Sequence, residues 1–371
     1  MKILFNVCFA VISLSVLAQK QNYLLIGTYT TGKSEGIYVY KFDSKTGDAT
    51  PVSSIKSSNP SYLAISPNQK YVYAVNENKP GDVTAYSFDK SNGSLTTINQ
   101  QSSKGDHPCY VTTSSNGKFV LVGNYSSGTL SVYPVKKDNS LDTASQVIAH
   151  SGSSANKDRQ ESAHVHQTVL SKDNKYVFVP DLGIDKVMIY QFNNSNGRLT
   201  KAAQPFVQTT AGAGPRHFDF HPNNKYAYLM EELSGTVEAF AYHNGKLKSI
   251  QTISSHPKDY TGTKGSADIH VSPDGKFLYC SNRGESNTIA IFKINPVNGK
   301  LTSIGFQSTM GLTPRNFNFD PGGNFLLVAN QNSDNIVVFK RNKQTGLLTD
   351  TGKRIEVGNP VCIKWIKADS K

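Results

Sequence analysis

Apolar and polar residues alternate on both sides of a short turn between residues 214 and 232. One run, around 218–220, leads into a Pro-Asn-Asn turn at 222–224, and a second alternating run leaves it. This pattern predicts a β-hairpin. Arg216 and Glu232 stand at its open ends, so pairing across the turn places a cation beside a carboxylate.

The same hairpin pattern returns along the chain. Six copies align on the residue after each turn, and successive copies are 48, 57, 50, 51 and 48 residues apart. These alignment residues are Lys70, Lys118, Lys175, Lys225, Lys276 and Asn324. Two further apolar runs follow each hairpin, for example at 236–240 and 247–250, and at 288–292 and 301–304. Four strands at a period of about 50 residues are typical of a β-propeller blade.

The two ends of the chain supply one more blade. Residues 359–363 resemble 59–63, the start of a first strand, and no further strand follows them in the sequence. The missing second, third and fourth strands match runs near the N-terminus, at residues 23–27, 36–40 and 50–53. We therefore predict an all-β fold, a single seven-bladed β-propeller over residues 19–371. Its last blade is closed by both termini, which removes free sheet edges.

The first residues differ from this pattern. Lys2 precedes an apolar run over residues 3–17, and Ala18 offers a small residue for cleavage before Gln19. These features predict a secretory signal peptide over residues 1–18, too short to span a membrane. We expect an exported protein, periplasmic or extracellular. A short buried N-terminal segment is the alternative.

Composition narrows the classes of partner. The formal net charge is +12, but the lysines are scattered and form no basic tract, so we expect no nucleic-acid partner. This charge favours solubility and a mild attraction of anionic ligands. Cys109, Cys280 and Cys362 remain after the predicted cleavage and form no Cys-x-x-Cys motif, although one disulfide among them stays open.

Two fixed positions of the repeat carry residues that differ in charge from copy to copy. Nine residues before the alignment residue stand Ser61, Cys109, His166, Arg216, Ala267 and Arg315. Seven residues after it stand Glu77, Tyr125, Leu182, Glu232, Arg283 and Gln331. A structural position should repeat similar apolar or small residues. Both positions lie at the open end of the hairpin, so they should form one ring around one mouth of the central channel.

From this ring we assign His166, Arg216, Glu232 and Arg283 as catalytic residues. Arg315 and Glu77 are assigned to substrate binding, together with the nearby His217, Asp268, His164 and Asp181. Ion pairs between blades are the alternative for the arginines, and a hydrogen-bonded inner-strand role is the alternative for His166. His164 and His166 share one strand face and would suit a metal pair, but no third ligand is evident.

Several motifs resemble those of the seven-bladed lactonase family. They are Gly-Pro-Arg-His with the following His-Pro (214–222), Ala-Asp-Ile-His-Val-Ser-Pro-Asp-Gly (267–275), Ser-Asn-Arg (281–283) and Thr-Pro-Arg-Asn-Phe (313–317). The family includes propeller-type 6-phosphogluconolactonases and fungal carboxy-muconate cyclases. The resemblance covers nearly all of the predicted mature chain and implies His166, Arg216, Glu232 and Arg283 as site residues. The predicted export signal departs from the bacterial cytosolic members.

The implied reaction is hydrolysis of an anionic sugar lactone, with 6-phosphogluconolactone as the leading substrate. Attack of water on a lactone carbonyl needs a base, a stabiliser for the oxyanion and a proton for the leaving alkoxide. We assign Glu232 as the base and His166 as the acid. Arg216 and Arg283 would hold the oxyanion and the anionic group of the substrate. We do not expect a serine nucleophile.

Alternatives stay open. A muconate-type cycloisomerase would use the His–Glu pair to move a proton without water. A non-catalytic exported propeller that binds a glycan or an envelope partner would show a broad exposed apolar face. A Ca²⁺-dependent lactonase would need Glu77, Asn124 and Asp181 to converge. We expect no cofactor, no metal and no membrane span. The oligomeric state is open, with a monomer favoured.

Overall fold

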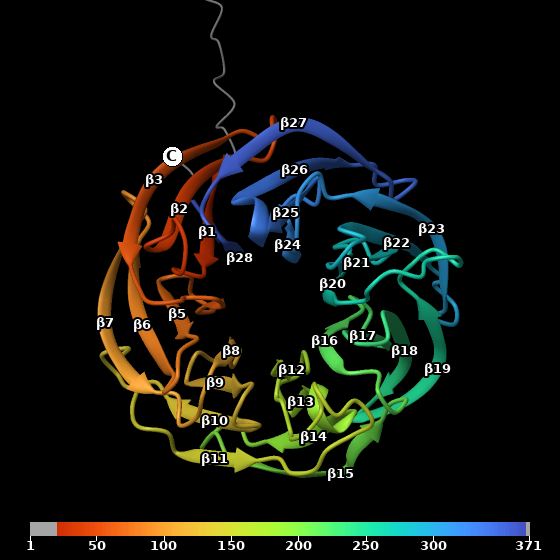
Figure 1. Ribbon diagram of the computed structural model, residues 1–371. Helices are drawn as coiled ribbons and strands as arrows, with labels where there is room; N and C mark the ends of the chain where they lie inside the picture. Colours follow the sequence, from red (N-terminus) through yellow and green to blue (C-terminus); the bar gives the residue numbers. More distant parts are fainter. Residues whose placement is uncertain (1–20, 369–371) are drawn as a thin grey trace, which may run out of the picture.

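The computed structural model describes residues 21–368, so the signal peptide predicted for residues 1–18 lies outside the described residues. Seven four-stranded antiparallel sheets surround a common axis (Figure 1). The predicted seven-bladed β-propeller is therefore confirmed. Two short 3-10 helices interrupt the strands, η1 (Leu182–Ile184) and η2 (Gln331–Ser333). Within residues 21–368, no helix has the length and apolar character needed to cross a membrane.

Each blade runs outward from the axis through four strands. The first strands lie nearest the axis and are β4 (Leu63–Ile65), β8 (Pro108–Thr113), β12 (Val169–Leu170), β16 (Pro215–Phe220), β20 (Ser266–Val271), β24 (Pro314–Phe319) and β28 (Pro360–Lys367). The second strands are β5 (Tyr71–Asn76), β9 (Phe119–Asn124), β13 (Tyr176–Asp181), β17 (Tyr226–Glu231), β21 (Phe277–Asn282), β25 (Phe325–Asn330) and β1 (Gln21–Thr28). The third strands are β6 (Asp82–Asp89), β10 (Thr129–Pro134), β14 (Lys186–Phe192), β18 (Thr236–His243), β22 (Thr288–Ile294), β26 (Asn335–Arg341) and β2 (Gly36–Asp43). The outer strands are β7 (Ser94–Ser102), β11 (Gln146–Ala149), β15 (Leu199–Gln208), β19 (Lys246–Ser254), β23 (Leu301–Ser308), β27 (Leu348–Glu356) and β3 (Ala49–Lys56).

The last blade joins the two ends of the described chain, as predicted. Strand β28 pairs antiparallel with β1, so that Trp365 lies opposite Leu24 and Ile363 opposite Ile26. Strands β2 and β3 then complete the sheet. This pairing closes the ring, because β28 contacts the first strands β24 and β4 of the two neighbouring blades.

The turn after each first strand explains the period of the repeat. The residue before each alignment residue has a positive φ, which reverses the chain between the two strands. These residues are Gln69, Gly117, Asn174, Asn224, Gly275 and Gly323. In four blades a serine hydroxyl donates to the Asn or Asp two residues later, and that side chain accepts from the backbone N–H of the alignment residue. The pairs are Ser66 and Asn68, Ser114 and Asn116, Ser171 and Asp173, and Ser272 and Asp274.

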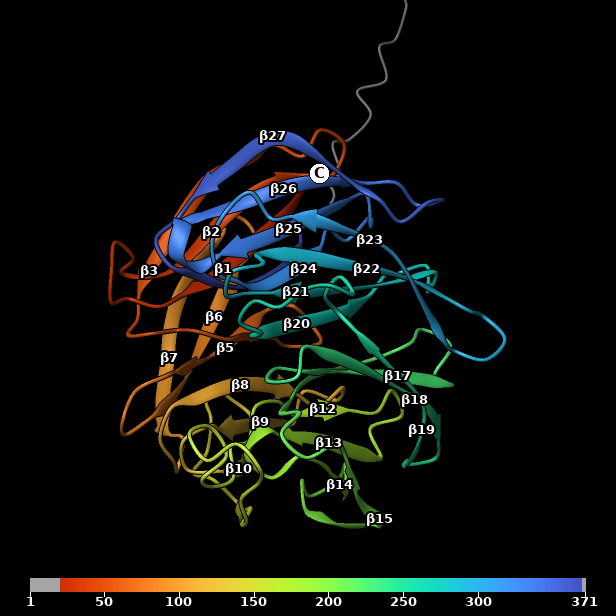
Figure 2. The same ribbon diagram turned by 45° about the vertical axis from the view of Figure 1, so that its right-hand side comes forward.

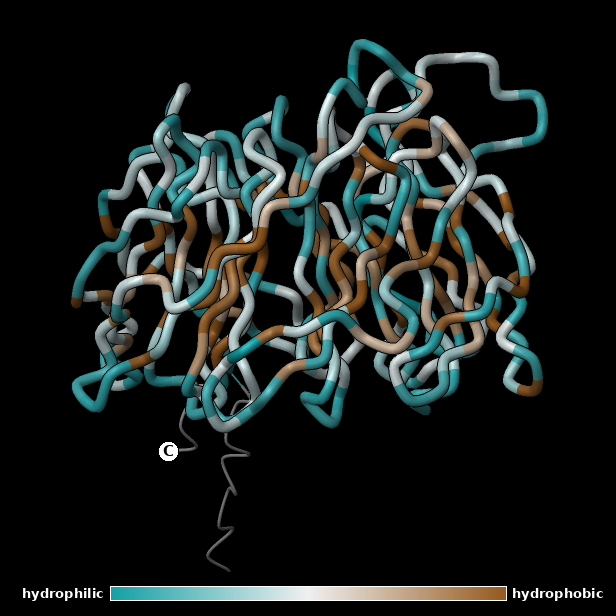
Figure 3. Tube along the Cα trace, turned by 90° about the horizontal axis from the view of Figure 1, so that it is seen from below, coloured by the Kyte–Doolittle hydropathy of each residue, from teal (hydrophilic) through white to brown (hydrophobic). Residues whose placement is uncertain are grey.

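The core lies between the blades. Each second strand packs against two neighbouring blades, and all residues of β9, β17, β21 and β25 are buried. Phe178 of β13, for example, stacks on Phe218 of β16 with ring centroids 5.5 Å apart. Figure 2 shows β20–β23 lying beside β24–β27 in the same manner. Hydrophobic residues concentrate midway along the strands, and hydrophilic residues occupy the loops at both ends (Figure 3).

Asparagines at the ends of the second strands hold the connections between blades. The side-chain amides of Asn76, Asn124, Asn282 and Asn330 donate to backbone carbonyls of the segment that leads to a first strand. They therefore close loops, which is the usual role of Asn at such positions. One residue further along, the side chains of Glu77, Tyr125 and Arg283 reach the channel mouth.

Candidate active site in the channel mouth

A β-bulge near the start of the first strand directs two consecutive residues to the channel. In β16 the pairing skips Arg216, because Pro215 pairs with Glu231 and His217 with Met230. Four other blades show a register shift at the same place. A bulge inserts an unpaired residue and changes the direction of its side chain. As a result, Arg216 and His217 both line the channel although they are neighbours in sequence.

A cavity of about 550 Å³, the mouth cavity, opens at one end of the channel. Five of the residues predicted from the repeat line it: Glu77, His166, Glu232, Arg283 and Arg315. A small adjoining cavity of about 10 Å³, the inner cavity, is lined by Arg216 and His217. His166 and Arg315 line both cavities. The two repeat positions therefore do form one charged ring around one mouth.

Glu232 is buried and is held by three guanidinium groups. Its Oε2 accepts from Nε of Arg216 at 2.7 Å and lies 3.0 Å from Nη2 of Arg283, while its Oε1 accepts from Nη2 of Arg159 at 2.7 Å. Burial alone would raise the pKa of Glu232, but the three arginines hold this pKa well below its usual range. A carboxylate in this state is a poor proton acceptor, which argues against its assignment as the base.

Backbone carbonyls at the start of β20 fix two of these arginines. Nη1 of Arg216 donates to the carbonyl of Ala267 at 2.7 Å, and Nε of Arg283 donates to the carbonyl of Gly265 at 2.8 Å. The alternative of an ion pair between blades thus holds for Arg283 with Glu232, whereas Arg216 pairs within its own hairpin. Both guanidinium groups nevertheless border the cavities.

Glu77 and Arg315 lie on another side of the mouth cavity and do not pair with each other. Glu77 accepts from the hydroxyl of Tyr29 at 2.8 Å and from that of Ser61 at 2.5 Å. The guanidinium carbon of Arg315 lies 5.3 Å from the centroid of the Tyr29 ring. Tyr29 is therefore a shared support for the two charged groups, and the repeat could not reveal it because it follows the N-terminal strand β1.

His166 is buried and neutral. Its ring lies edge-on to those of Tyr125 and His217, with centroids 5.5 and 5.3 Å away. Burial, and next the charge of Arg216, lowers the pKa of His166 well below its ordinary value. Nδ1 lies 3.9 Å from the sulfur of Cys109, and Nε2 has no hydrogen-bond partner among residues 21–368. The ring can therefore accept a proton in the cavity, but it carries none to donate from a cationic state at neutral pH.

Cys109 beside His166 does not form a nucleophilic pair with it. The thiol donates toward the backbone carbonyls of Val165 and His166 at 3.6 and 3.5 Å. Burial, followed by the charge of Glu77, raises the pKa of Cys109, so the sulfur stays protonated. All three described cysteines are unpaired, so the disulfide left open by the sequence does not form among them.

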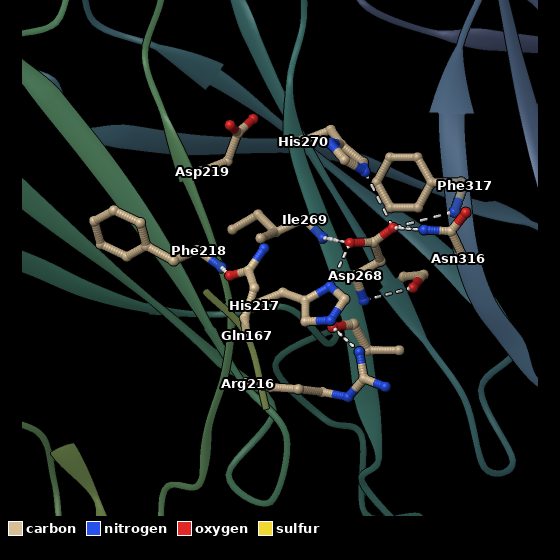
Figure 4. A network of polar contacts seen from close by, with 12 residues as sticks. Gln167, Arg216, His217, Phe218, Asp219, Asp268, Ile269, His270, Asn316 and Phe317 are labelled. Atoms are coloured by element: carbon tan, nitrogen blue, oxygen red, sulfur yellow. Dashed lines mark hydrogen bonds and ion pairs between the residues drawn. The ribbon is translucent and has the colours of Figure 1, made fainter. Parts of the chain in front are cut away.

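Asp268 is the centre of a second polar layer beside the inner cavity, which we call the inner layer (Figure 4). Its Oδ1 accepts from Nδ1 of His217 at 2.7 Å, and its Oδ2 accepts from Nε2 of His270 at 3.1 Å. The amide of Asn316 and two backbone N–H groups complete its shell. Asp268 lines neither cavity and His217 lines only the inner one. We therefore correct their assignment: they organise the channel wall instead of meeting the substrate in the mouth cavity.

His164 and Asp181 are also corrected, because their polar atoms are committed elsewhere. His164 stacks on Tyr125 at 4.5 Å, and its Nδ1 donates to the carbonyl of Tyr125 at 3.0 Å. Asp181 is fully buried, accepts from the backbone N–H of Gly183 and caps η1. Its Oδ2 lies 2.7 Å from Nδ1 of His150. Neither residue lines the mouth cavity.

Arg159 is a further residue of the mouth cavity that the repeat could not identify. It lies in the insertion between β11 and β12, which has no counterpart in the other blades. The neighbouring Gln160 is fully buried and donates to the carbonyl of Leu182 and to Asp185, both at 2.8 Å. This anchor places the Arg159 guanidinium at the cavity, where it binds Glu232 while its side chain remains 44% exposed. The length of the insertion was the only available signal.

Comparison with known proteins shows the family of the chain. The family model described as "Lactonase, 7-bladed beta-propeller" matches residues 23–365. The chain belongs to this lactonase family. A 6-phosphogluconolactonase of Bacillus subtilis is 40% identical over 345 residues, which are 92% of this chain and 97% of the relative. One of Formosa agariphila is 42% identical over 334 residues, 88% of this chain and 94% of the relative. The structure of a periplasmic gluconolactonase of Pseudomonas aeruginosa aligns with a TM-score of 0.90 and 41% identity, covering 94% of this chain and 100% of that one.

This lactonase-family chain contains one stretch with the letters of a nucleophile elbow, Gly-Lys-Ser-Glu-Gly (32–36). Such an elbow requires a strand-to-helix turn that exposes the serine. Ser34 instead precedes strand β2, is buried, and lies 2.5 Å from the hydroxyl of Thr28. It is therefore not a nucleophile. Among the described residues, no group of three or more His, Cys, Asp or Glu side chains is arranged to hold a metal ion.

Proposed function

We propose that this protein hydrolyses an anionic sugar lactone, with 6-phosphogluconolactone as the leading substrate. The mouth cavity carries the proposal. Together with the adjoining inner cavity it is lined by four arginines and two glutamates, which leave a formal surplus of two positive charges beside a neutral histidine. The names of the two bacterial relatives and of the Pseudomonas structure support a lactone as the substrate.

The electrostatics favour His166 over Glu232 as the group that takes a proton from the attacking water. Nε2 of His166 is neutral and unpartnered, whereas Glu232 is neutralised by three cations. An anionic substrate would also counter the positive charges that depress the pKa of His166, and would make this ring a stronger base. Glu232 then acts by holding Arg159, Arg216 and Arg283 in place.

The protons balance in this scheme. His166 accepts one proton as the water oxygen bonds to the carbonyl carbon, and the imidazolium returns it to the ring oxygen as the ring C–O bond breaks. The oxyanion that forms between these steps needs donors. Nη2 of Arg216 and Nη1 of Arg283 are available, because neither has a hydrogen-bond partner among residues 21–368. Preorganised donors of this kind are the main source of rate enhancement in acyl transfer.

A lactone panel tests the proposal. The protein without residues 1–18 is assayed with phosphorylated and unphosphorylated sugar lactones, with and without a chelator. We expect hydrolysis of both, faster for 6-phosphogluconolactone, and no effect of the chelator. Cyclisation of a muconate without any lactone hydrolysis would replace the proposal by the cycloisomerase.

We also propose that the mature protein is exported. The pattern of residues 1–18 supports this, as does the periplasmic location named for the Pseudomonas relative. N-terminal sequencing of the protein from its native host should find Gln19 first. An intact Met1 would overturn the proposal.

A further inference from the structure

Arg315 differs from the other arginines of the site in having no protein partner. Arg159, Arg216 and Arg283 all bind Glu232. Within residues 21–368, no hydrogen bond or ion pair reaches the guanidinium of Arg315, and its only close support is the face of the Tyr29 ring. The ring fixes the guanidinium by a cation–π contact and leaves its N–H donors free.

The carboxylate of Glu77, although it lies nearby, is not bound to Arg315 as a counter-ion. Glu77 is close enough to Arg315 to influence its pKa, but it forms no ion pair with it, and its Oε2 accepts hydrogen bonds from the hydroxyls of Tyr29 and Ser61. Because of its bulge, Arg315 lines both the mouth cavity and the inner cavity. A half-buried arginine that faces a cavity with free donors is arranged to receive an anion.

We propose that Arg315, seated on Tyr29, is the receptor for a phosphate monoester on the lactone, and that it sets specificity without acting on the ring that opens. This inference rests on the proposed function. A guanidinium binds two phosphate oxygens at once. The four arginines and two glutamates that line the two cavities leave a surplus of two positive charges, which matches a phosphate dianion better than a single carboxylate.

The test compares wild-type protein with Arg315→Gln and Arg315→Lys, using kcat/KM for 6-phosphogluconolactone and for gluconolactone. Loss of hydrogen bonds to a charged group typically costs about 10- to 100-fold in affinity. Arg315→Gln should lower kcat/KM by that factor for the phosphorylated lactone and by less than about threefold for gluconolactone. For the phosphorylated lactone, kcat/KM of Arg315→Lys should lie between those of wild type and Arg315→Gln, because lysine keeps the positive charge but lacks the two parallel N–H donors of the guanidinium. Inorganic phosphate should inhibit gluconolactone hydrolysis by wild type and much less by Arg315→Gln.

Two controls sharpen the result. Glu77→Gln removes the negative charge near Arg315, so inorganic phosphate should inhibit this variant more strongly than wild type. Arg315→Gln should have the opposite effect on this inhibition. Arg354→Gln removes an arginine that binds Asp350 on the outer strand β27, and it should change kcat/KM for neither lactone.

Equal losses with both lactones would overturn the inference, because Arg315 would then act on the reacting groups. No loss with either would make Arg315 a structural cation and would also overturn it. Calorimetry with 6-phosphogluconate separates this inference from the proposed hydrolysis. Binding to wild type but not to Arg315→Gln would support the subsite even if no lactone were hydrolysed.

Discussion

The mouth cavity and the inner layer around Asp268 lie next to each other, and the neighbouring residues Arg315 and Asn316 of β24 belong one to each, yet the two differ in how far their polar groups are satisfied. In the inner layer, both oxygens of Asp268 are bound by side-chain and backbone donors. In the mouth cavity, Arg315 and Nε2 of His166 have no partner within residues 21–368. Both layers are polar and differ from blade to blade, so residue type alone does not separate them.

The difference identifies which layer is built to bind a ligand. Burying a polar group without a partner is costly, so a protein keeps such groups only where something else will meet them. In the inner layer, the hydrogen-bond donors around Asp268 are paired with its oxygens, and these bonds hold the first strands together. In the mouth cavity, some donors and acceptors have no protein partner, and a lactone can bind to these groups.

The largest expected effect comes from a matched pair of histidine variants. His166→Leu removes the proposed base and should lower kcat by about 10²–10⁴-fold. Its stability should change little, because the only polar contact of the ring side chain among residues 21–368 is a long one with the sulfur of Cys109, and leucine can still pack against Tyr125 and His217. His217→Leu should do the reverse. It removes a buried donor from Asp268 and should destabilise the fold by about 2–3 kcal/mol, with a much smaller loss of activity.

Lactone assays and urea unfolding of the two proteins check this pair. If His217→Leu lost activity as severely as His166→Leu while remaining stable, the inner layer would take part in the reaction. The comparison between the two layers would then fail.

Glu232→Gln should damage both properties at once. The variant leaves the buried Arg216 without its counter-charge, and breaking a buried ion pair typically costs about 3–5 kcal/mol. Activity should fall because three guanidinium groups lose their common anchor. The kcat–pH profile distinguishes this role from that of a base. If Glu232 only positions the arginines, the acidic limb of the profile should persist in Glu232→Gln, and its disappearance would restore Glu232 as the base.

The fold could be predicted from the sequence because the repeat depends on local chemistry. A residue of positive φ and a Ser–Asx pair recur at the turns, and the apolar alternation between them fixes which strands pair. Closure by β1 and β28 followed from matching incomplete copies at the two ends. Within each copy these signals lie within a few residues of each other, so each incomplete copy at an end of the chain can be recognised by itself.

The site could be predicted only in part. The repeat positions predicted that His166, Glu232 and Arg283 lie around one cavity. They gave no information on how many arginines surround Glu232. Arg159 binds that carboxylate from an insertion that has no equivalent in the other copies of the repeat. The sequence therefore could not show that Glu232 is a weak base. Asp181 is a carboxylate in the same blade as His166, which is why the sequence suggested it for substrate binding. Its oxygens instead bind His150 and the backbone N–H of Gly183, and His150 comes close only in the folded chain.

A smaller effect is expected from pH. Burial, and then Arg216, lowers the pKa of His217 to about 4 in the folded protein. In the unfolded chain this histidine binds a proton near pH 6.5, so between 6.5 and 4 only the unfolded state is protonated there. Stability is therefore complete above pH 6.5 and falls by about 3 kcal/mol on acidification to pH 4.

The neighbours of His217 modify this slope. His166 shifts in the same direction and steepens it. For His270, burial lowers the pKa but Asp268 raises it by more, so this residue opposes the loss. Urea unfolding of wild type and His217→Leu at pH 7 and 4.5 isolates the contribution of His217. The variant should lose less stability than wild type over this interval, and an equal loss in both proteins would contradict the assignment.

The smallest effect should come from adding one methyl group to the mouth cavity. Gly265 lines this cavity, and a Cβ built there meets no atom within 4 Å. Gly265→Ala should therefore fold at least as stably as wild type, since alanine restricts the unfolded chain by about 0.4–1 kcal/mol. The methyl group narrows the space for the lactone, so KM should rise by about two- to fivefold with kcat nearly unchanged. Gly305→Ala on the outer strand β23 is the matched control, because its Cβ would meet only Leu347, at 3.7 Å. If Gly265→Ala were as silent in KM as Gly305→Ala, the lactone would not occupy this side of the cavity, and binding would be confined to the side held by Arg315.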